Sequence, residues 1–137
     1  MKKKSLKLSL RIDWSDMDLF GHVNNVSYFR YIQAGRVNYW DSCNMEKFAT
    51  NSRSGAILLS TSCQFIKPLH YPGNIIVETS VEFIKTSSFG ICHKIYNDQN
   101  EVAAEAHDVL VMFDYTKNEK VPIPEDFRKA VELVATK

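Results

Sequence analysis

The sequence has few of the features that mark secreted, membrane-spanning or nucleic-acid-binding proteins. Its three cysteines, Cys43, Cys63 and Cys92, are an odd set without a CxxC pair, which favours reduced thiols in a cytoplasmic chain over a disulfide framework. The 17 Lys and Arg nearly balance the 16 Asp and Glu, so no net field would attract nucleic acid or an anionic membrane. The apolar runs are far shorter than the ~20 residues that cross a bilayer, and polar residues interrupt the N-terminal segment where an export signal would need an apolar stretch. We therefore expect a soluble cytoplasmic protein whose specificity lies in a local site.

Motifs of several enzyme classes are also missing. The absence of a G-x-S-x-G nucleophile elbow argues against a serine hydrolase. No glycine-rich phosphate loop or dinucleotide fingerprint is present. Asp16, Asp18 and His22 are possible metal ligands, but no further group of His or Cys residues has zinc-like spacing. The sequence therefore predicts no cofactor and no metal.

The hydrophobic pattern predicts one strand followed by one long helix. Apolar residues occupy the even positions from Leu6 to Trp14, and this period of two puts them on one face of a half-buried strand. Residues 26–41 lack proline and are apolar around most of the helical circumference, which predicts a helix largely surrounded by protein. Gly35 lowers the stability of such a helix by up to ~1 kcal/mol relative to alanine, so we expect something to pack closely there.

The rest of the chain has the composition of a β-sheet. Four segments are rich in strand-forming residues, and turn residues separate two pairs of them: 56–67, 74–85, 88–96 and 101–115. The short connections predict an antiparallel meander, and a proline-led amphipathic helix closes the chain. We expect a single α+β domain over residues 1–137, in which a curved antiparallel sheet wraps around the central helix. The edge strands of such a sheet favour pairing with a second copy, so we expect at least a homodimer.

The stretch DMDLFGHVNN, residues 16–25, holds the densest group of chemically active side chains. It directly precedes the predicted helix, where up to four backbone N–H groups lack intrahelical partners and can hold a negatively charged oxygen. These donors would polarise the carbonyl of an ester or thioester. A carboxylate a few residues upstream could attack that carbonyl to form a mixed anhydride, or activate a water as general base. Asp18 has the right placement for either role.

The same stretch resembles a known signature. DMDLFGHVNNVSYFRYIQAGR is similar to the pattern D-x-D-x-x-G-H-V-x-N-x-x-Y-x-x-Y-x-E-x-A-R of hotdog-fold acyl-CoA thioesterases of the 4-hydroxybenzoyl-CoA thioesterase family, and the likeness continues along nearly the whole chain. The resemblance implies the hotdog fold, Asp18 as the catalytic carboxylate and the backbone N–H of Asn25 as the donor to the thioester oxygen. It also implies that Gly21 permits the tight loop, that Tyr28 lies near the acyl pocket and that the site forms across a dimer interface.

Two positions depart from that pattern, and two roles stay open. Gln33 replaces the usual acid of the helix, and Gly35 replaces the usual alanine. A related group carries its catalytic carboxylate within the helix, but residues 26–40 contain no Asp or Glu, which leaves the loop carboxylate as the candidate. Asp16 either braces the loop or takes part in the chemistry. His22 is either a polar orienter or proton relay of the site, or a structural histidine.

Other contacts to the substrate are predicted less directly. Ser87 and Ser88 fall where the resemblance places a strand beside the pocket, so they either contact the substrate from the neighbouring subunit or are ordinary strand hydroxyls. The phosphates of coenzyme A (CoA) should bind exposed cations, for which Lys67, Lys85 and Arg53 are candidates.

The sequence thus predicts an acyl-CoA thioesterase that releases a free carboxylic acid and CoA, as a homodimer or homotetramer. An enzymatic alternative is a thioesterase acting on acyl carrier protein, because WSDMD followed by HVNN also resembles the plant enzymes of that kind. The other alternative is a non-catalytic module that binds acyl-CoA or fatty acid. Asp18 argues against such a module, since a carboxylate beside an apolar tunnel is costly to retain without use.

Overall fold

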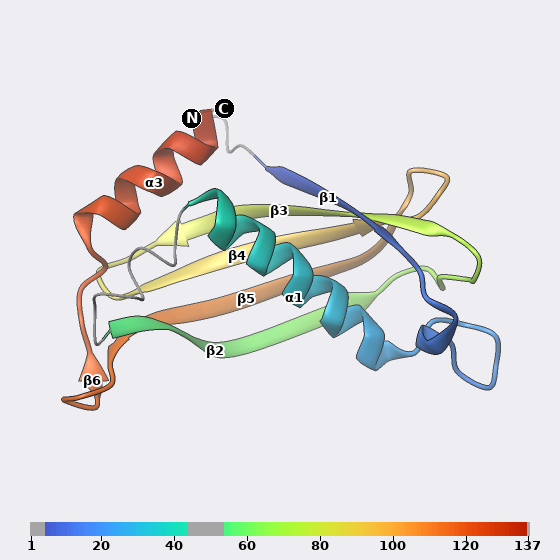
Figure 1. Ribbon diagram of the computed structural model, residues 1–137, viewed down its shortest axis with the longest axis horizontal. Helices are drawn as coiled ribbons and strands as arrows, with labels where there is room; N and C mark the ends of the chain where they lie inside the picture. The colour runs from blue at the N-terminus through green and yellow to red at the C-terminus, as the bar shows by residue number, and fades with distance from the viewer. Residues whose placement is uncertain (1–4, 44–53, 137) are drawn as a thin grey trace.

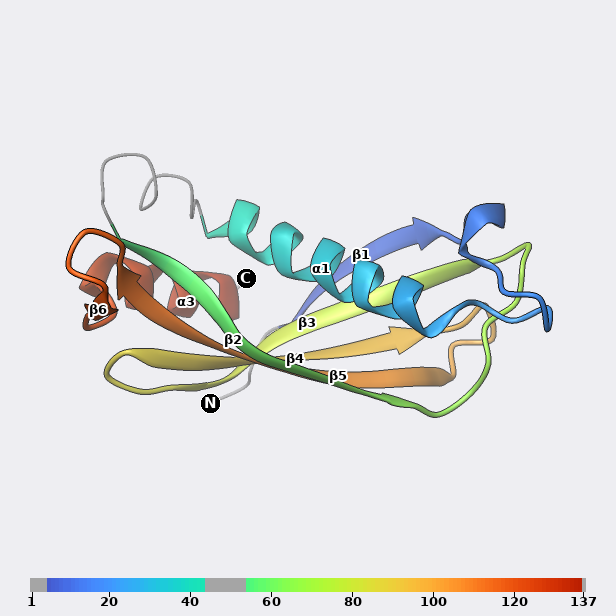
Figure 2. The same cartoon turned by 90° about the horizontal axis from the view of Figure 1, so that it is seen from below.

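The computed structural model describes residues 5–43 and 54–136, which form one antiparallel sheet with helices on one side and at one end. In chain order the elements are β1 (Leu6–Arg11), the short 3-10 helix η1 (Trp14–Asp16), α1 (Asn25–Ser42), β2 (Ser54–Phe65), β3 (Asn74–Ile84), β4 (Ser88–Tyr96), β5 (Val102–Asp114), β6 (Glu119–Lys120) and α3 (Glu125–Thr136). The long strands lie in the order β1-β3-β4-β5-β2, and β6 pairs with β5. α1 runs along one face of the curved sheet (Figures 1 and 2), which confirms the predicted α+β arrangement.

The position of β2 in the sheet differs from the prediction. β3, β4 and β5 form the expected meander, but β2 pairs with β5 and β1 pairs with β3. The connection 66–73 carries the chain from β2 past β5 and β4 to β3, instead of turning back along β2. Alternating apolar residues determine which face of a strand is buried, but not which strand lies beside it. The prediction of a meander of all four strands is therefore wrong.

The first strand is shorter than its apolar pattern. Leu6, Leu8 and Leu10 are more buried than the polar residues between them, as predicted, but β1 ends at Arg11. Trp14 lies in η1 and is 75% exposed, so its expected place on the buried face is wrong. The reason is a capping box around Asp13, which accepts a hydrogen bond from the N–H of Ser15 at 2.8 Å and starts the 3-10 helix.

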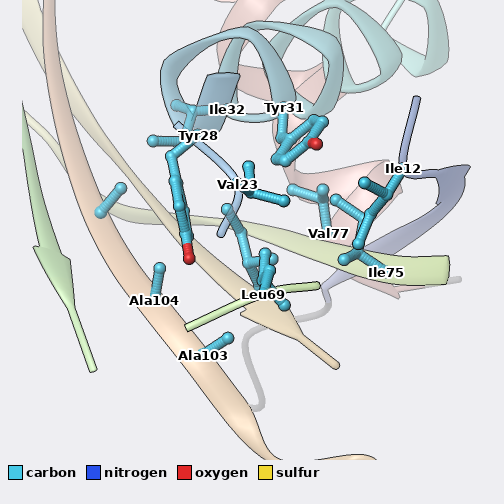
Figure 3. Packing of buried hydrophobic residues seen from close by; sticks show 12 residues of the cluster. Ile12, Val23, Tyr28, Tyr31, Ile32, Leu69, Ile75, Val77, Ala103 and Ala104 are labelled. Carbon is cyan, nitrogen blue, oxygen red and sulfur yellow. The ribbon is translucent and has the colours of Figure 1, made fainter. Parts of the chain in front are cut away.

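α1 buries one face only. The buried positions follow the helical period: Ser27, Tyr28, Tyr31, Ile32, Gly35 and Tyr39. Figure 3 shows Tyr28 and Tyr31 pointing from α1 toward the sheet, with Val23 and Leu69 packed in the same cluster. On the opposite face Val26 is 64% exposed and Val37 is 46% exposed. The expectation that protein surrounds most of the helix is wrong within one chain, because the sheet covers a single side of it.

At Gly35 the helix packs directly on the sheet, which confirms the close approach predicted there. A Cβ atom at this position would lie 2.7 Å from Cγ1 of Val77, 2.8 Å from Oγ1 of Thr79 and 3.3 Å from Nδ1 of His93. Non-bonded heavy atoms pack best at ~3.5–4.0 Å. Any side chain at position 35 would therefore push α1 away from β3 and β4.

A charged cluster lies beneath α1. Asp108 of β5 and His93 of β4 are both fully buried, and Nε2 of His93 is 2.7 Å from Oδ2 of Asp108. Arg36 of α1 donates to the same carboxylate at 3.0 Å, and the hydroxyl of Thr61 in β2 donates to it at 2.7 Å. Thr79 of β3 lies 2.9 Å from Nδ1 of His93. These polar contacts join α1 to four strands in one network.

The C-terminal helix α3 begins after Pro124, as the sequence predicted. It buries Phe127 and Val131 in a second apolar cluster with Tyr39 of α1 and Phe89 of β4. This cluster holds α3 at the end of the sheet where α1 finishes. None of the helices within residues 5–43 and 54–136 is long and apolar enough to cross a membrane.

Candidate active site

The loop between η1 and α1 folds back on itself. Met17 and Val23 form a β-bridge, and the N–H of Asp18 donates to the carbonyl of His22 at 2.8 Å. Gly21 has φ +84°, a backbone conformation that favours glycine. No atom lies within 4 Å of a Cβ built on Gly21, so the backbone conformation and not space requires glycine here.

The carboxylate of Asp18 is oriented by the backbone of this loop. Its Oδ1 accepts hydrogen bonds from the N–H of Phe20 at 2.9 Å and from the N–H of His22 at 3.2 Å. Among the described residues, no donor contacts Oδ2. The loop therefore holds Asp18 in a defined orientation through one oxygen and leaves the other oxygen for a substrate or a water.

The start of α1 leaves one backbone donor without a partner. The N–H of the N-cap residue Asn24 donates to the carbonyl of Asp16, and the side chain of Asn24 accepts from the N–H of Val26 at 2.9 Å. The N–H of Ser27 donates to the carbonyl of Asn24 at 2.9 Å. Of the first four N–H groups, only that of Asn25 has no acceptor within the described part of the chain. This donor is the one that the resemblance assigns to the thioester oxygen.

A pocket of about 350 Å³ joins this donor to the carboxylate. Its walls come from the loop, the start of α1 and the segment after β2: Asp18, His22, Val23, Asn25, Tyr28, Phe65, Ile66, Lys67 and Pro68. The rings of Tyr28 and Phe65 pack edge to face at 5.0 Å, and the hydroxyl of Tyr28 donates to the carbonyl of Lys67 at 3.3 Å. Burial raises the pKa of Tyr28, which keeps this hydroxyl protonated. The structure therefore brings together Asp18, His22, Asn25 and Tyr28.

Of the segment 65–68, the sequence suggested only Lys67, as a cation for CoA, and did not predict that Phe65, Ile66 and Pro68 line this pocket. The segment carries no local catalytic motif, and it reaches the loop only because β2 ends beside the start of α1. A second pocket, of about 360 Å³, extends from Leu69 to the turn at Asn97. It shares Lys67 and Pro68 with the candidate site but contains neither Asp18 nor Asn25.

The sequence also missed the neighbour of His22. His22 is exposed, and its ring packs edge to face against that of His70 at 5.0 Å. Nδ1 of His70 lies 3.4 Å from the carbonyl of Gly21. The ring of His22 is thus placed at the open side of the pocket by a residue from the connection between β2 and β3.

Asp16 braces the loop, which is one of the two roles left open by the sequence. It is 4% exposed, and its Oδ2 accepts from the hydroxyl of Tyr31 at 2.7 Å and from the N–H of Asp13 at 3.0 Å. Oδ1 accepts from Arg30 and, at 3.4 Å, from the hydroxyl of Ser27. Burial, and then Asp16 itself, raise the pKa of Tyr31 well above its ordinary value, so Tyr31 remains a donor. These contacts occupy both carboxylate oxygens of Asp16, and its side chain does not line the pocket.

The profile of the Thioesterase-like superfamily matches residues 12–131 of the chain, from the end of β1 to α3. The chain belongs to this superfamily. A curated relative, Uncharacterized protein YsmA of Bacillus subtilis (strain 168), is 30% identical over 84 residues, which are 61% of this chain and 51% of YsmA. That match spans about half the length of the relative.

Solved structures share the fold of this member of the Thioesterase-like superfamily. The PA2801 protein of Pseudomonas aeruginosa is 27% identical, with a TM-score of 0.82 over 91% of this chain and 96% of that one. Slr0204, a 1,4-dihydroxy-2-naphthoyl-CoA thioesterase from Synechocystis, is 15% identical, with a TM-score of 0.84 over 93% of this chain and 96% of that one. These likenesses confirm the hotdog fold, and the superfamily membership confirms the predicted resemblance to thioester hydrolases.

Ser87 and Ser88 of this superfamily member lie at the opposite end of the sheet from the loop (Figure 1). Ser88 begins β4 and pairs with Val111, while the carbonyl of Ser87 accepts from the N–H of Met112 at 2.7 Å. Within one chain they do not reach the pocket, so a contact with the substrate stays a prediction that needs a second copy.

The three cations considered for CoA have different positions. Lys67 lines the pocket and forms an ion pair with Glu101. Lys85 lies at the far end, with its Nζ 5.2 Å above the ring of Phe83. Arg53 lies outside the described residues. Of the two cations that the structure describes, Lys67 is the one that lines the pocket with Asp18.

Proposed function

We propose that the protein is an acyl-CoA thioesterase, which hydrolyses a thioester to a free carboxylic acid and CoA. The observation that carries this proposal is the placement of the Asp18 carboxylate and the N–H of Asn25 in one pocket. Within the described residues, neither Oδ2 of Asp18 nor that N–H has a protein partner. A carboxylate beside a donor at a helix N-terminus suits attack on a carbonyl carbon, because the donor stabilises the oxygen on which negative charge develops.

In the proposed reaction the N–H of Asn25 binds the thioester oxygen, aided by the positive end of the α1 dipole. Removal of one such donor in other enzymes costs about 3–4 kcal/mol of transition-state stabilisation. Asp18 then either attacks the carbonyl carbon, giving a mixed anhydride that water hydrolyses, or takes a proton from an attacking water. The carbon–sulfur bond breaks in both routes and the thiolate of CoA leaves.

Other pocket residues support this chemistry. Gly21 permits the turn that aims Asp18, and His22 at the open side of the pocket orients the water or relays its proton. Tyr28 and Phe65 provide an apolar wall for the acyl group, and Lys67 provides a positive charge for a phosphate of CoA. A CoA thioester is favoured as substrate because Slr0204, which has the same fold, is a thioesterase for such a compound.

A homodimer formed along β2 would complete the site. Among the described strands β2 pairs only with β5, so its other edge is open for a second β2. Leu59 of β2 is 63% exposed and Phe65 of the same strand is 49% exposed. Antiparallel pairing of two β2 strands would cover these residues.

The same pairing would place the far end of one copy near the pocket of the other. Ser87 and Ser88 would then be able to contact the substrate from the neighbouring subunit. Light scattering coupled to size-exclusion chromatography tests this arrangement, including its extension to a tetramer. We expect a dimer or tetramer for the wild type, monomers for Leu59→Lys because it places charge on the paired edge, and an unchanged oligomer for Leu59→Ala. A monomeric wild type would refute the shared site.

The decisive test of function is the release of free thiol from a panel of short, long and aromatic acyl-CoAs. Asp18→Asn keeps the size and the hydrogen-bonding oxygen of the side chain but removes the base, so turnover should fall ~100-fold or more. Asp41→Asn, on the exposed surface at the end of α1, is the matched control and should keep full activity. Circular dichroism should give the same unfolding transition for wild type and both variants.

Each outcome of this assay has a distinct meaning. Retained turnover in folded Asp18→Asn would exclude Asp18 as the carboxylate. A wild type inactive on every acyl-CoA, but active on acyl carrier proteins, would identify the carrier-protein thioesterase instead. Binding of acyl-CoA without hydrolysis of either class would identify a non-catalytic module.

A further inference from the structure

A second group of chemically active side chains lies on the face of the sheet turned away from α1, which we call the outer face. Successive side chains of a strand point to opposite faces. His93 and Asp108 point into the buried network under α1, so the residues directly before them, Cys92 and His107, point to the outer face. Cys92 of β4 and His107 of β5 are direct cross-strand partners. The register therefore places a thiol beside an imidazole.

Glu82 of β3 joins this pair through a β-bulge. The register between β3 and β4 shifts between Val81 and Phe83, so Glu82 is the extra residue, and bulges commonly re-aim a side chain. Both carboxylate oxygens of Glu82 lie 3.0 Å from Nδ1 of His107. One ligand atom from each of Glu82, Cys92 and His107 can be chosen so that all lie within 4.8 Å of one another.

A fourth donor stands next to these three. Oε1 of Glu105 lies 3.9 Å from Sγ of Cys92 and 3.8 Å from Nε2 of His107. Lys94, opposite Glu105 in the strand register, is a positive charge near the same group and competes for that carboxylate. Glu105 is therefore a weaker ligand candidate than Glu82.

The chemistry of this donor set matches one class of ligand. Zn²⁺ binds thiolate, imidazole and carboxylate tetrahedrally at ~2.0–2.3 Å, which puts neighbouring ligand atoms about 3.3–3.6 Å apart. The observed separations, from 3.0 Å to at most 4.8 Å, bracket these values, so rotation of half-exposed side chains suffices to close the site. We propose that Glu82, Cys92 and His107 form a binding site for Zn²⁺ or a similar divalent transition-metal ion, with Glu105 or water as the fourth ligand.

A thiol, an imidazole and a carboxylate could instead form a nucleophilic triad. A nucleophilic cysteine needs a lowered pKa. Burial first, and then Glu82 and Glu105, raise the pKa of Cys92 to about 11. A metal ion would displace the thiol proton and neutralise the surrounding carboxylates, so these surroundings suit a cation better than a nucleophile.

The site would join β3, β4 and β5 on the side of the sheet opposite α1. Its metal therefore stabilises the folded sheet and takes no part in hydrolysis at Asp18. The sequence did not indicate this site, because its ligands come from three separate strands with no short motif between them. The inference is independent of the proposed thioesterase activity.

Cobalt binding tests the proposal directly, because Co²⁺ bound to a thiolate gives a charge-transfer band in the near ultraviolet. Metal-free wild-type protein is titrated with Co²⁺, and Zn²⁺ is then added in competition. The matched variants are Cys92→Ser, His107→Gln and the control Cys63→Ser, whose thiol is also half-buried and has a pKa of about 11. Thermal unfolding with and without Zn²⁺ gives a second readout.

We expect one Co²⁺ per chain in the wild type and in Cys63→Ser, displacement by Zn²⁺, and a higher Tm with Zn²⁺. Cys92→Ser should lose the band, and His107→Gln should weaken binding more than ~100-fold, beyond the effect of losing a supporting residue. Binding should also weaken as the pH falls, because protons compete with the metal ion for its ligands. The proposal is overturned if the wild type shows no thiolate band, if the band survives in Cys92→Ser, or if metal binds only at many weak sites that the variants do not change. Unchanged unfolding of the metal-free variants would show that these losses are not failures to fold.

Discussion

Replacing Asp108 with asparagine should remove a large part of the stability of this protein. The carboxylate is fully buried and is held by Arg36, His93 and Thr61 at 3.0, 2.7 and 2.7 Å. An amide keeps one acceptor oxygen but leaves Arg36, whose side chain is only 13% exposed, without its counter-charge. Removal of one partner from a buried ion pair costs about 3–5 kcal/mol, because the other charge stays buried. The free energy of unfolding of a protein is commonly only about 5–15 kcal/mol, so a loss of this size should be easy to measure.

Urea unfolding at pH 7, followed by circular dichroism, measures this loss as a lower free energy of unfolding. Asp41→Asn makes the same chemical change at an exposed position and should unfold like the wild type. A loss below about 1 kcal/mol for Asp108→Asn would refute the reasoning, because that is the range of exposed ion pairs.

The same network predicts how stability depends on acid. Burial opposes ionisation of Asp108, but hydrogen bonds from His93, Arg36 and Thr61 outweigh it, so the pKa of Asp108 is lowered in the folded protein. A group with a lowered folded pKa contributes stability above its unfolded pKa of ~3.9, and that contribution is lost as the pH falls through the folded value. The gap in stability between wild type and Asp108→Asn should therefore be constant near neutral pH and shrink below pH ~4. A gap that stays constant to lower pH would contradict the assignment.

Two glycines give further predictions. Gly35→Ala gains up to ~1 kcal/mol of helix propensity but overpacks the contact with Val77 and Thr79 by about 1–3 kcal/mol, so urea unfolding should show a net loss of up to about 2 kcal/mol. The control Gln33→Ala, on the exposed face of α1, should be neutral or slightly stabilising, and a Gly35→Ala variant more stable than the wild type would mean that the helix lies farther from the sheet. Gly21→Ala should lower the free energy of unfolding by about 1–3 kcal/mol, because alanine is strained at this positive φ, and the protein should still fold. It should also lower thioester turnover, since the strained loop no longer orients the carboxylate of Asp18. Unchanged turnover would mean that the loop tolerates the change.

The site loop could be predicted from the sequence because its parts are close along the chain. Asp18, Gly21 and Asn25 lie within one short stretch at the start of a helix, so a turn and a helix N-terminus are enough to bring a carboxylate and a backbone donor together. The close approach at Gly35 was also predictable locally, because a glycine inside an apolar helix lowers helix stability and is expected mainly where another element packs closely. Periods of two and of 3.6 residues likewise indicated most of the described strands and the helices α1 and α3.

Only the tertiary structure determined which distant segments meet. The pairing of β2 with β5, the pocket wall at 65–68 and the place of Ser87 far from the pocket all depend on strand order and register, on which a one-strand sequence pattern carries no information. The buried charges under α1 and the metal-ligand set on the outer face come from neighbouring strands through cross-strand pairing. The sequence by itself determined the local chemistry of this protein, because bonded neighbours and helix ends are local. The tertiary structure decided its surroundings, because burial and cross-strand contact join residues that the chain keeps apart.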